Sequence, residues 1–183
     1  GQKLSASIEI VQQQSKGRNV IARLKSKHPK EPPLVMGAHI DHLGYGEHGS
    51  LATEDKKIQF GADDNASGSA VTMEVARLLS ESNFKPKRTI IFGLWTAEEM
   101  GLIGSRYYVA NPSDGVTMDK VVTYFNMDMV GLGTRIGAPG ALNFPRIFDV
   151  IMKNQDEDIK NAVDARTGGP GGSDHSAFIT LGI

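Results

Sequence analysis

Residues 66–95 read ASGSAVTMEVARLLSESNFKPKRTIIFGLW, a helical pattern followed by an apolar run. Four aliphatic side chains in the first half recur at positions i, i+4, i+7 and i+8: Val71, Val75, Leu78 and Leu79. This spacing places the four side chains on one face of a helix, so the sequence predicts a helix over residues 66–80. The apolar run at residues 89–95 predicts a buried strand as the next element.

Strands and helices alternate on both sides of this pair. Apolar runs predict buried strands at residues 34–38 and 121–127. Helical patterns predict helices at residues 102–110 and 145–154, the second with Pro in its first turn. Because strands that alternate with helices form sheets covered on both faces, the sequence predicts an α/β fold with a mixed β-sheet sandwiched between helices.

Segments near the two ends of the chain also resemble strands. Residues 7–11 and 19–25 flank a turn at residues 15–17, which predicts a hairpin at the sheet edge. Residues 181–183 resemble the start of a further strand. With 183 residues, the chain is long enough for one domain with a single core.

The composition excludes several classes of site. The sequence has no Cys, so disulfides, thiolate ligands and a Cys nucleophile are excluded. The net charge is −1 and the basic residues are scattered, so we expect no nucleic-acid partner, which would require a concentrated basic face. No apolar run approaches the roughly 18 residues of a membrane-spanning helix, so we expect no membrane span.

Five short polar motifs stand where predicted strands or loops end. They are Ala38-His39-Ile40-Asp41, Gly61-Ala62-Asp63-Asp64-Asn65, Thr96-Ala97-Glu98-Glu99, Asn126-Met127-Asp128 and Gly172-Ser173-Asp174-His175. The motifs that contain His39, Glu98 and Asp128 directly follow predicted buried strands. Since ligand sites in open α/β sheets gather at the carboxyl ends of strands, we expect these motifs to converge in space.

Each motif alone has a structural explanation. Asp63 or Asp64 could cap the following helix, and Glu98 and Glu99 could complement a helix dipole. Asp128 could form an Asx-turn at the end of its strand. Together, however, the motifs would bring seven carboxylates to one edge of the sheet without Lys or Arg among them, which is costly unless cations are bound. Imidazole and carboxylate ligands without thiolate suit Zn²⁺, with Mn²⁺ or Co²⁺ as alternatives.

In order and approximate spacing, these motifs resemble those of the zinc aminopeptidases of the bacterial leucyl aminopeptidase type. The superfamily also contains glutamate carboxypeptidase II, the transferrin receptor and the glutaminyl cyclases. The resemblance covers residues 34–183. It implies a zinc exopeptidase-like fold and a single peptidase catalytic domain over residues 1–183, which we expect to be truncated at its C-terminal end. It also implies a secreted or periplasmic location in preference to a cytoplasmic one.

The resemblance implies two Zn²⁺ ions and the residues that hold them. Asp64 would bridge the two ions. His39 and Asp128 would complete the protein ligands of one ion, and Glu99 and His175 those of the other. Asp63 is adjacent to Asp64 and would be structural.

The resemblance also implies two catalytic roles beside the metal ligands. Glu98 would act as the general base, taking a proton from the attacking water and passing it to the leaving amine. Asp41 would orient His39, as a metal-bound His usually requires. A cis peptide bond is implied between Asp64 and Asn65. His28 lies in a Lys- and Pro-rich loop and is interpreted as exposed. His42 and His48 follow the first ligand in a polar loop, where they could line the cleft, although surface or structural roles are favoured.

The function implied is that of a metallo-exopeptidase, an aminopeptidase that removes N-terminal residues from peptides with a free N-terminus. A dizinc carboxypeptidase or dipeptidase on the same scaffold is an alternative, with Arg106, Arg135 and Arg146 as candidates for binding substrate carboxylates. A glutaminyl cyclase would lack the metal-binding His at the position of His39. A non-catalytic, receptor-like binding module would lack the metal ligands, all of which are present in this sequence.

Overall fold

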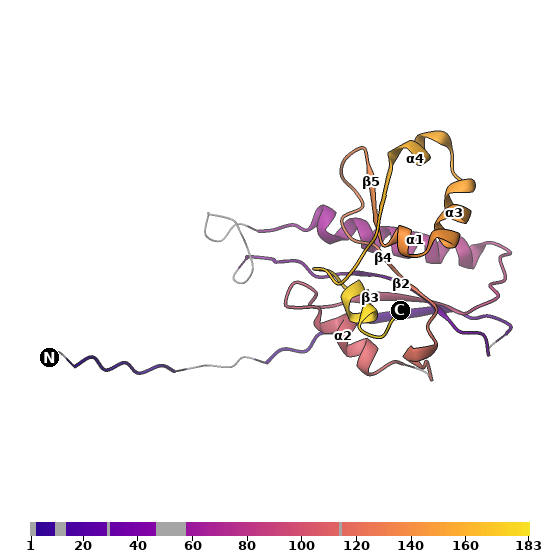
Figure 1. The fold of residues 1–183 in the computed structure, drawn as a ribbon. Coiled ribbons are helices and arrows are strands. Elements are labelled where there is room, and N and C mark those ends of the chain that lie inside the picture. The colour runs from indigo at the N-terminus through magenta and orange to yellow at the C-terminus, as the bar shows by residue number, and fades with distance from the viewer. Residues whose placement is uncertain (1–2, 10–13, 29, 47–57, 114) are drawn as a thin grey trace.

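The computed structural model describes residues 3–9, 14–28, 30–46, 58–113 and 115–183 (Figure 1). The sheet that carries the predicted motifs has four strands. They are β1 (Val20–Leu24), β2 (Leu34–His39), β3 (Ile90–Trp95) and β4 (Tyr124–Asn126). The strand order is β1-β3-β2-β4, with β1 antiparallel to β3 and the other pairs parallel. The predicted mixed sheet is therefore confirmed.

Helices lie on both sides of this sheet. In Figure 1, α1 (Gly68–Glu81) runs along one side of the strands, and α2 (Ile103–Ala110) and α5 (His175–Ile179) lie on the other. The irregular turn η1 (Ala62–Ser67) leads into α1, and the short helix η2 (Met118–Lys120) precedes β4. The predicted helices at residues 66–80 and 102–110 are thus confirmed. The α/β sandwich follows from this arrangement.

A second, smaller unit follows β4 in the chain. It contains the parallel pair β5 (Ile136–Pro139) and β6 (Val163–Arg166). Between these strands lie η3 (Ala141–Asn143), α3 (Pro145–Lys153) and α4 (Glu157–Ala162). Only α3 was predicted from the sequence. The strands β5 and β6 have four residues each, none of them buried, and their sequences lack the apolar run by which a buried strand is recognised.

An aromatic cluster fixes α2 and α5 to the strands. Trp95, at the end of β3, and Phe178, in α5, have no exposed surface. The Trp95 ring lies 5.0 Å from that of Tyr108 in α2, and Phe178 stacks on Tyr124 of β4 at 3.9 Å. Aromatic rings bury large apolar areas, so this cluster anchors α5 beside the carboxyl end of β4.

The buried residues of α1 are small ones: Gly68, Ser69 and Thr72. Of the four aliphatic side chains that share one predicted face, Val71 and Leu78 are 38% and 52% exposed, and Val75 and Leu79 are half-buried. Small side chains let the helix approach the sheet closely, and the Ser69 hydroxyl donates a hydrogen bond to the carbonyl of His39 at 2.8 Å. The hydrophobic pattern thus predicted the helix, whereas the residues that contact the sheet follow from the packing.

The predictions for the two ends of the chain are confirmed only in part. The predicted strand at residues 19–25 is present as β1, but it pairs with β3. Of the predicted strand at residues 7–11, residues 7–9 are exposed without regular structure, and residues 10 and 11 lie outside the described residues. At the other end, Leu181 and Gly182 donate backbone hydrogen bonds to Phe178 and Ile179, so these residues form a turn that closes α5. Strand pairing depends on distant partners, which a local pattern does not reveal.

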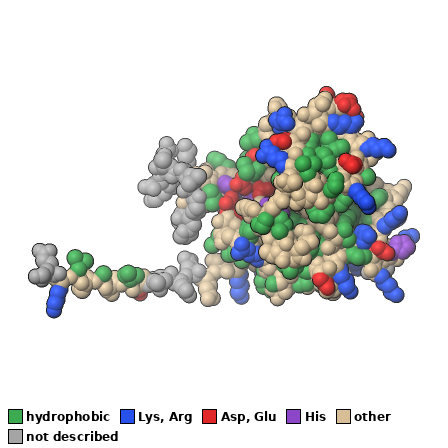
Figure 2. All heavy atoms as spheres, in the orientation of Figure 1, with side chains coloured by type: hydrophobic (Ala, Val, Ile, Leu, Met, Phe, Trp, Pro, Cys, Tyr) green, Lys and Arg blue, Asp and Glu red, His purple; other side chains and the backbone are tan. Residues whose placement is uncertain are grey.

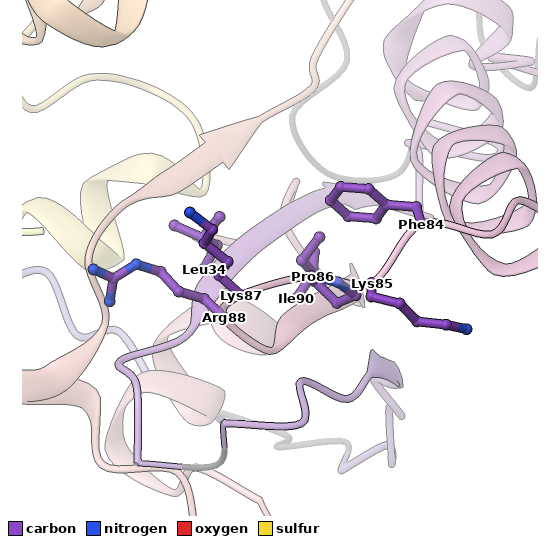
Figure 3. Close-up of a pocket in the computed structure, with 7 residues that line it drawn as sticks. All are labelled: Leu34, Phe84, Lys85, Pro86, Lys87, Arg88 and Ile90. Atoms are coloured by element: carbon purple, nitrogen blue, oxygen red, sulfur yellow. The ribbon is translucent and has the colours of Figure 1, made fainter.

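A small hollow of about 350 Å³ lies at the opposite end of the sheet from the polar motifs. Figure 3 shows its lining side chains, which come from the loop between α1 and β3 and from the first residues of β2 and β3. Leu34 and Ile90 begin these strands, whereas His39 and Trp95 end them. The hollow is therefore separate from the candidate site. Among the described residues, no helix has the length and apolar character needed to cross a membrane.

Candidate metal centre

His39 is the last residue of β2 and is only 1% exposed. Its Nδ1 lies 3.0 Å from the backbone oxygen of Asp41. Because a carbonyl oxygen can only accept a hydrogen bond, Nδ1 carries a hydrogen, and Nε2 is the nitrogen that would bind a metal after losing its own proton. This arrangement is typical of a metal-binding His, whose second nitrogen is fixed by a hydrogen bond.

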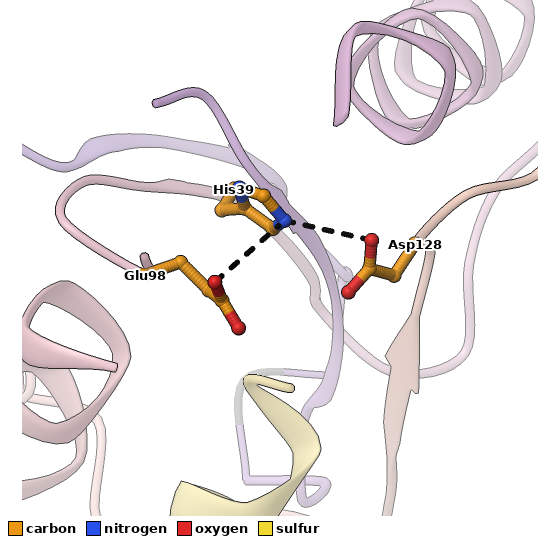
Figure 4. A group of neighbouring side chains, drawn as sticks. All are labelled: His39, Glu98 and Asp128. Atoms are coloured by element: carbon orange, nitrogen blue, oxygen red, sulfur yellow. Dashed lines mark ion pairs between the residues drawn. The ribbon is translucent and has the colours of Figure 1, made fainter. Parts of the chain in front are cut away.

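Three carboxylates from separate motifs surround His39 Nε2. The distances are 3.2 Å to Asp64 Oδ1, 3.5 Å to Asp128 Oδ1 and 4.0 Å to Glu98 Oε2. Figure 4 shows His39 between Glu98 and Asp128, which approach it from the ends of different elements. One atom each of His39, Glu98 and Asp128 lies within 4.8 Å of the others, a spacing suitable for a metal ion.

A second group of possible ligands contains His42, Asp64 and Glu99. His42 Nδ1 lies 2.6 Å from Glu99 Oε1 and 3.9 Å from Asp64 Oδ2. Asp64 thus presents Oδ1 to the first group and Oδ2 to the second. Its carboxylate lies between the two groups, as a bridging ligand would.

Asp41 determines where Glu98 and Glu99 lie. Its carboxylate accepts hydrogen bonds from the backbone nitrogen of Glu98 at 3.0 Å and of Glu99 at 3.2 Å. The adjacent glutamates then direct their side chains to different groups, Glu98 to the first and Glu99 to the second. Asp41 therefore holds both the His39 imidazole and the turn that carries the two glutamates.

The backbone is unusual beside three of the motifs. The peptide bond between Asp64 and Asn65 is cis, which confirms that expectation. Ala97 and Met129 have positive φ angles of 55° and 52°, and each adjoins one of the site carboxylates. Positive φ is uncommon in residues other than Gly and concentrates at functional sites.

Asn65 connects two of these motifs. Its Nδ2 donates to the backbone oxygen of Met127 at 3.0 Å, and its Oδ1 accepts from the backbone nitrogen of Gly68 at 3.0 Å. The start of α1 is thereby tied to the segment that carries Asp128. The side chain of Asn65 is buried, so these hydrogen bonds are shielded from water.

A chain of hydrogen bonds runs from the core to Asp128. Trp95 Nε1 donates to Tyr124 Oη at 2.9 Å, and Tyr124 Oη donates to Asn126 Oδ1 at 2.8 Å. Asn126 Nδ2 donates to Ser173 Oγ at 2.8 Å, and Ser173 Oγ donates to Asp128 Oδ2 at 2.6 Å. Each group donates toward the carboxylate, so Oδ2 is fixed and Oδ1 faces His39.

The carboxylates and the imidazole shift one another's pKa values. Burial lowers the pKa of His39, but the hydrogen bond and charge of Asp128, with the charge of Glu98, raise it to about 9. Burial raises the pKa of Glu98 to about 7, against the opposing charge of His39. The pKa of Asp174 is raised to about 6, also by burial. Burial acts on Asp128 as well, but hydrogen bonds from His39 and Ser173 lower its pKa.

Several buried polar atoms in the site have no hydrogen-bond partner among the described residues. They include Asp128 Oδ1, Glu99 Oε1 and His42 Nδ1. Buried polar atoms are normally satisfied, so three such atoms in one place indicate a missing partner. A divalent cation would supply that partner and balance the carboxylates. On the face shown in Figure 2, Asp and Glu side chains gather beside His side chains. The residues present therefore fit a metal ion.

His175 lies outside both groups of possible ligands in the described part of the chain. It begins α5, is half-buried, and its charge helps to lower the pKa of Asp128. The structure brings His39, Asp64, Glu99 and Asp128 together but does not add His175 to them. Its role as a ligand stays a prediction.

His42 is the site residue that the sequence interpretation missed. The sequence favours a surface or structural role over a place in the cleft, whereas the structure brings His42 to Asp64 and Glu99. A usable signal was present, because His42 follows His39 by three residues in the same loop. His28 is exposed, and His48 lies outside the described residues.

The three arginines considered for a carboxypeptidase are all exposed. Arg106 lies in α2 and Arg146 in α3. Arg135 precedes β5, where its charge acts on Asp164. None of the three has an ion pair with a site carboxylate among the described residues.

Comparison with known proteins gives this site a family context. A 134-residue match to the glutamate carboxypeptidase 2 homolog of Caenorhabditis elegans is 33% identical and covers 71% of this chain and 15% of that protein. The leupeptin-inactivating enzyme 1 of Streptomyces exfoliatus is 34% identical over 170 residues, covering 91% of this chain and 34% of that protein. The chain thus spans about a third or less of these relatives.

A solved structure shares the fold as well. The zinc aminopeptidase BSAP from Bacillus subtilis superposes with a TM-score of 0.70 at 26% identity, covering 90% of this chain and 38% of that one. The family model for peptidase family M28 matches residues 19–183, which include all five polar motifs. The chain therefore belongs to peptidase family M28.

Proposed function

We propose that this chain carries the catalytic site of a zinc-dependent aminopeptidase that removes N-terminal residues from peptides. The observation that supports this most directly is the convergence of His39, Asp64 and Asp128 beside a buried Glu98. Metal-assisted peptide hydrolysis requires metal ligands and a carboxylate base held next to them. The zinc aminopeptidase BSAP, which has the same fold, supports the choice of metal.

In this proposal two Zn²⁺ ions share Asp64. His39 and Asp128 complete the protein ligands of one ion. Glu99 belongs to the other, for which the resemblance to zinc aminopeptidases suggests His175. Bound zinc would lower the pKa of water towards about 7 and polarise the scissile carbonyl.

Glu98 is the proposed general base. It is 8% exposed, and its backbone is fixed by Asp41, so its carboxylate is held at the edge of the first group. A carboxylate in this position could take a proton from the attacking water and give it to the leaving amine. Glu98 is therefore kept out of the ligand set, because a ligating carboxylate would lose this capacity.

Asp41 is proposed to position these groups without contacting the substrate. Its backbone oxygen holds His39 Nδ1, so Nε2 points at the carboxylates. Its carboxylate holds the backbone of Glu98 and Glu99. Loss of either interaction would misplace a ligand and the base together.

A free N-terminus is the expected substrate feature, because a strongly acidic site attracts an ammonium group. Matched peptides that differ only in acetylation of the N-terminus or amidation of the C-terminus test this. We expect acetylation to abolish cleavage and amidation to leave it nearly unchanged. Equal rates on free and acetylated peptides would rule out an aminopeptidase.

The carboxypeptidase alternative draws support from the Caenorhabditis elegans relative, whose name is glutamate carboxypeptidase 2 homolog. The same peptides distinguish it, since a carboxypeptidase would lose activity on C-terminal amidation. A receptor-like module would cleave none of them.

Zinc content measured on the same sample is expected to approach two equivalents, and a value near one would contradict the two-ion proposal.

A further inference from the structure

We propose that Asp63 is a positioning residue of the metal centre, which fixes the segment after Asp128 relative to the turn that carries Asp64. This inference rests on the zinc site proposed above but concerns a residue that is not a ligand. Asp63 joins neither group of possible ligands among the described residues. Its Oδ1 instead accepts a hydrogen bond at 2.7 Å from the backbone nitrogen of Gly131, 68 residues further along the chain.

Three consecutive backbone N–H groups, those of residues 129–131, donate hydrogen bonds to side chains of the η1 turn. Their acceptors, in the same order, are Asn65 Oδ1 at 3.4 Å, Ser67 Oγ at 3.0 Å and Asp63 Oδ1 at 2.7 Å. We call these three contacts the η1 clamp. The contact to Asp63 is the shortest of the three, and a carboxylate acceptor makes a hydrogen bond stronger than a neutral one does. Asp63 is therefore expected to contribute most to the clamp.

The acceptors of the clamp are themselves connected. Ser67 Oγ accepts from the backbone nitrogen of Val130 and donates to the backbone oxygen of Asp63 at 2.6 Å. A Cβ atom added at Gly131 would lie 2.9 Å from Asp63 Oδ1 and 3.0 Å from Ser67 Cβ. The absence of a side chain at Gly131 therefore lets its backbone approach the η1 turn closely enough to donate to Asp63.

The clamp explains the unusual backbone of Met129, which directly follows Asp128. Met129 has a φ of 52°, a value uncommon in residues other than Gly. Such a conformation persists where the surrounding structure holds it, and here the N–H groups of residues 129–131 are all held by η1. The direction in which the chain leaves Asp128 is thus set by these hydrogen bonds.

The clamp connects the chain beside two carboxylates that approach His39. Asp63 precedes Asp64, and the clamped residues follow Asp128. The Oδ1 atoms of Asp64 and Asp128 lie 3.2 and 3.5 Å from His39 Nε2. Hydrogen bonds that orient metal ligands tune the affinity for the metal, so a clamp that fixes these two carboxylates relative to one another should strengthen zinc binding.

The test compares Asp63→Ala with Asp63→Asn. Ala removes the acceptor of the Gly131 N–H, whereas Asn keeps an oxygen acceptor on a side chain of the same size. Asp149→Ala is the control, because it removes an exposed Asp from α3. Chelator competition measures the zinc affinity of each protein. Hydrogen–deuterium exchange without added zinc reports on the backbone N–H groups of residues 129–131 directly.

We expect Asp63→Ala to bind zinc about 10- to 100-fold more weakly than the parent, the usual effect of losing an interaction that orients a ligand. Exchange at residues 129–131 should become faster, while exchange in β3 stays as in the parent. Asp63→Asn should restore most of the zinc affinity and the slow exchange. Gly131→Ala should reproduce Asp63→Ala, because it displaces the donor and leaves Asp63 in the chain.

Three results would overturn the inference. Parent-like exchange at residues 129–131 in both Asp63→Ala and Gly131→Ala would show that no clamp holds this segment. Faster exchange with parent-like zinc affinity would show that the clamp does not position the ligands. An equal loss of affinity in Asp63→Asn would assign the effect to the charge of Asp63. A parent that binds no zinc would instead refute the proposed function, while the exchange data would still decide whether the clamp exists.

Discussion

At the scale of single residues, the site separates two neighbouring glutamates into different surroundings. Glu98 is 8% exposed and faces His39, whereas Glu99 faces His42 and Asp64. The backbone hydrogen bonds to Asp41 hold both residues in place. One carboxylate is thereby free to move a proton, and the other is placed to bind a metal.

Glu98→Gln removes the proposed base while keeping the size of the side chain. We expect kcat to fall by about 100-fold or more, the usual effect of losing a general base, with little change in zinc content. Glu99→Gln is the matched control, and it should instead weaken zinc binding. Steady-state kinetics and elemental analysis on both variants measure this. The reverse pattern would mean that the two roles are exchanged.

At the scale of elements, the hydrogen-bonded chain from Trp95 to Asp128 connects β3, β4 and the loop before α5. The chain passes through Tyr124, Asn126 and Ser173 with every donor directed at the carboxylate. Packing of Phe178 on Tyr124 holds α5 against β4 and so keeps Ser173 within reach. The position of Asp128 thus depends on how three elements pack.

Ser173→Ala breaks this chain at its last step. Asp128 Oδ2 loses the hydroxyl that donates to it, so its carboxylate should turn more freely and bind zinc about 10- to 100-fold more weakly. Ser80→Ala is the control, because the Ser80 hydroxyl bonds only its own exposed helix. Chelator competition measures the affinities. Equal affinities for the two variants would show that the chain does not position Asp128.

At the scale of the whole molecule, the zinc-free fold gathers groups that hold protons more tightly than the unfolded chain does. The pKa values of His39, Glu98 and Asp174 are raised from 6.5, 4.5 and 3.8 to about 9, 7 and 6. A group with a raised pKa in the folded state contributes stability below its unfolded pKa and loses that contribution as the pH rises through the folded value. All three groups therefore lower the stability of the zinc-free protein as the pH rises.

The zinc-free protein should therefore lose stability as the pH rises from about 4 to 9. One pKa unit corresponds to about 1.4 kcal/mol, so the Glu98 part is on the order of a few kcal/mol between about pH 4.5 and 7. Urea unfolding across this range measures how the free energy of unfolding changes with pH. Glu98→Gln should reduce this change between about pH 4.5 and 7, and Glu157→Gln on the exposed α4 is the control. A flat profile in the parent would contradict this expectation.

Zinc should reverse the trend. Because imidazole and carboxylate must lose their protons to bind a metal, zinc affinity rises with pH. The stability that zinc adds should then increase over the range in which the zinc-free protein weakens. Unfolding with and without zinc at each pH checks both statements on one sample.

The sequence alone determined the main elements and where the chemistry lies. Apolar runs predicted β2 and β3, and helical spacing predicted α1, α2 and α3, because these signals are local. Since the ends of parallel strands meet at one edge of a sheet, the sequence also predicted that His39, Glu98 and Asp128 would converge. Their geometry agrees with that expectation.

Only the tertiary structure decided the rest. The pairing of β1 with β3, the buried face of α1 and the β5–β6 unit depend on contacts between residues far apart in the chain. The same holds for the contact of His42 with Glu99, which are brought together by the adjacent strands β2 and β3. A local pattern records which side chains are polar or apolar, but packing decides which of them meet.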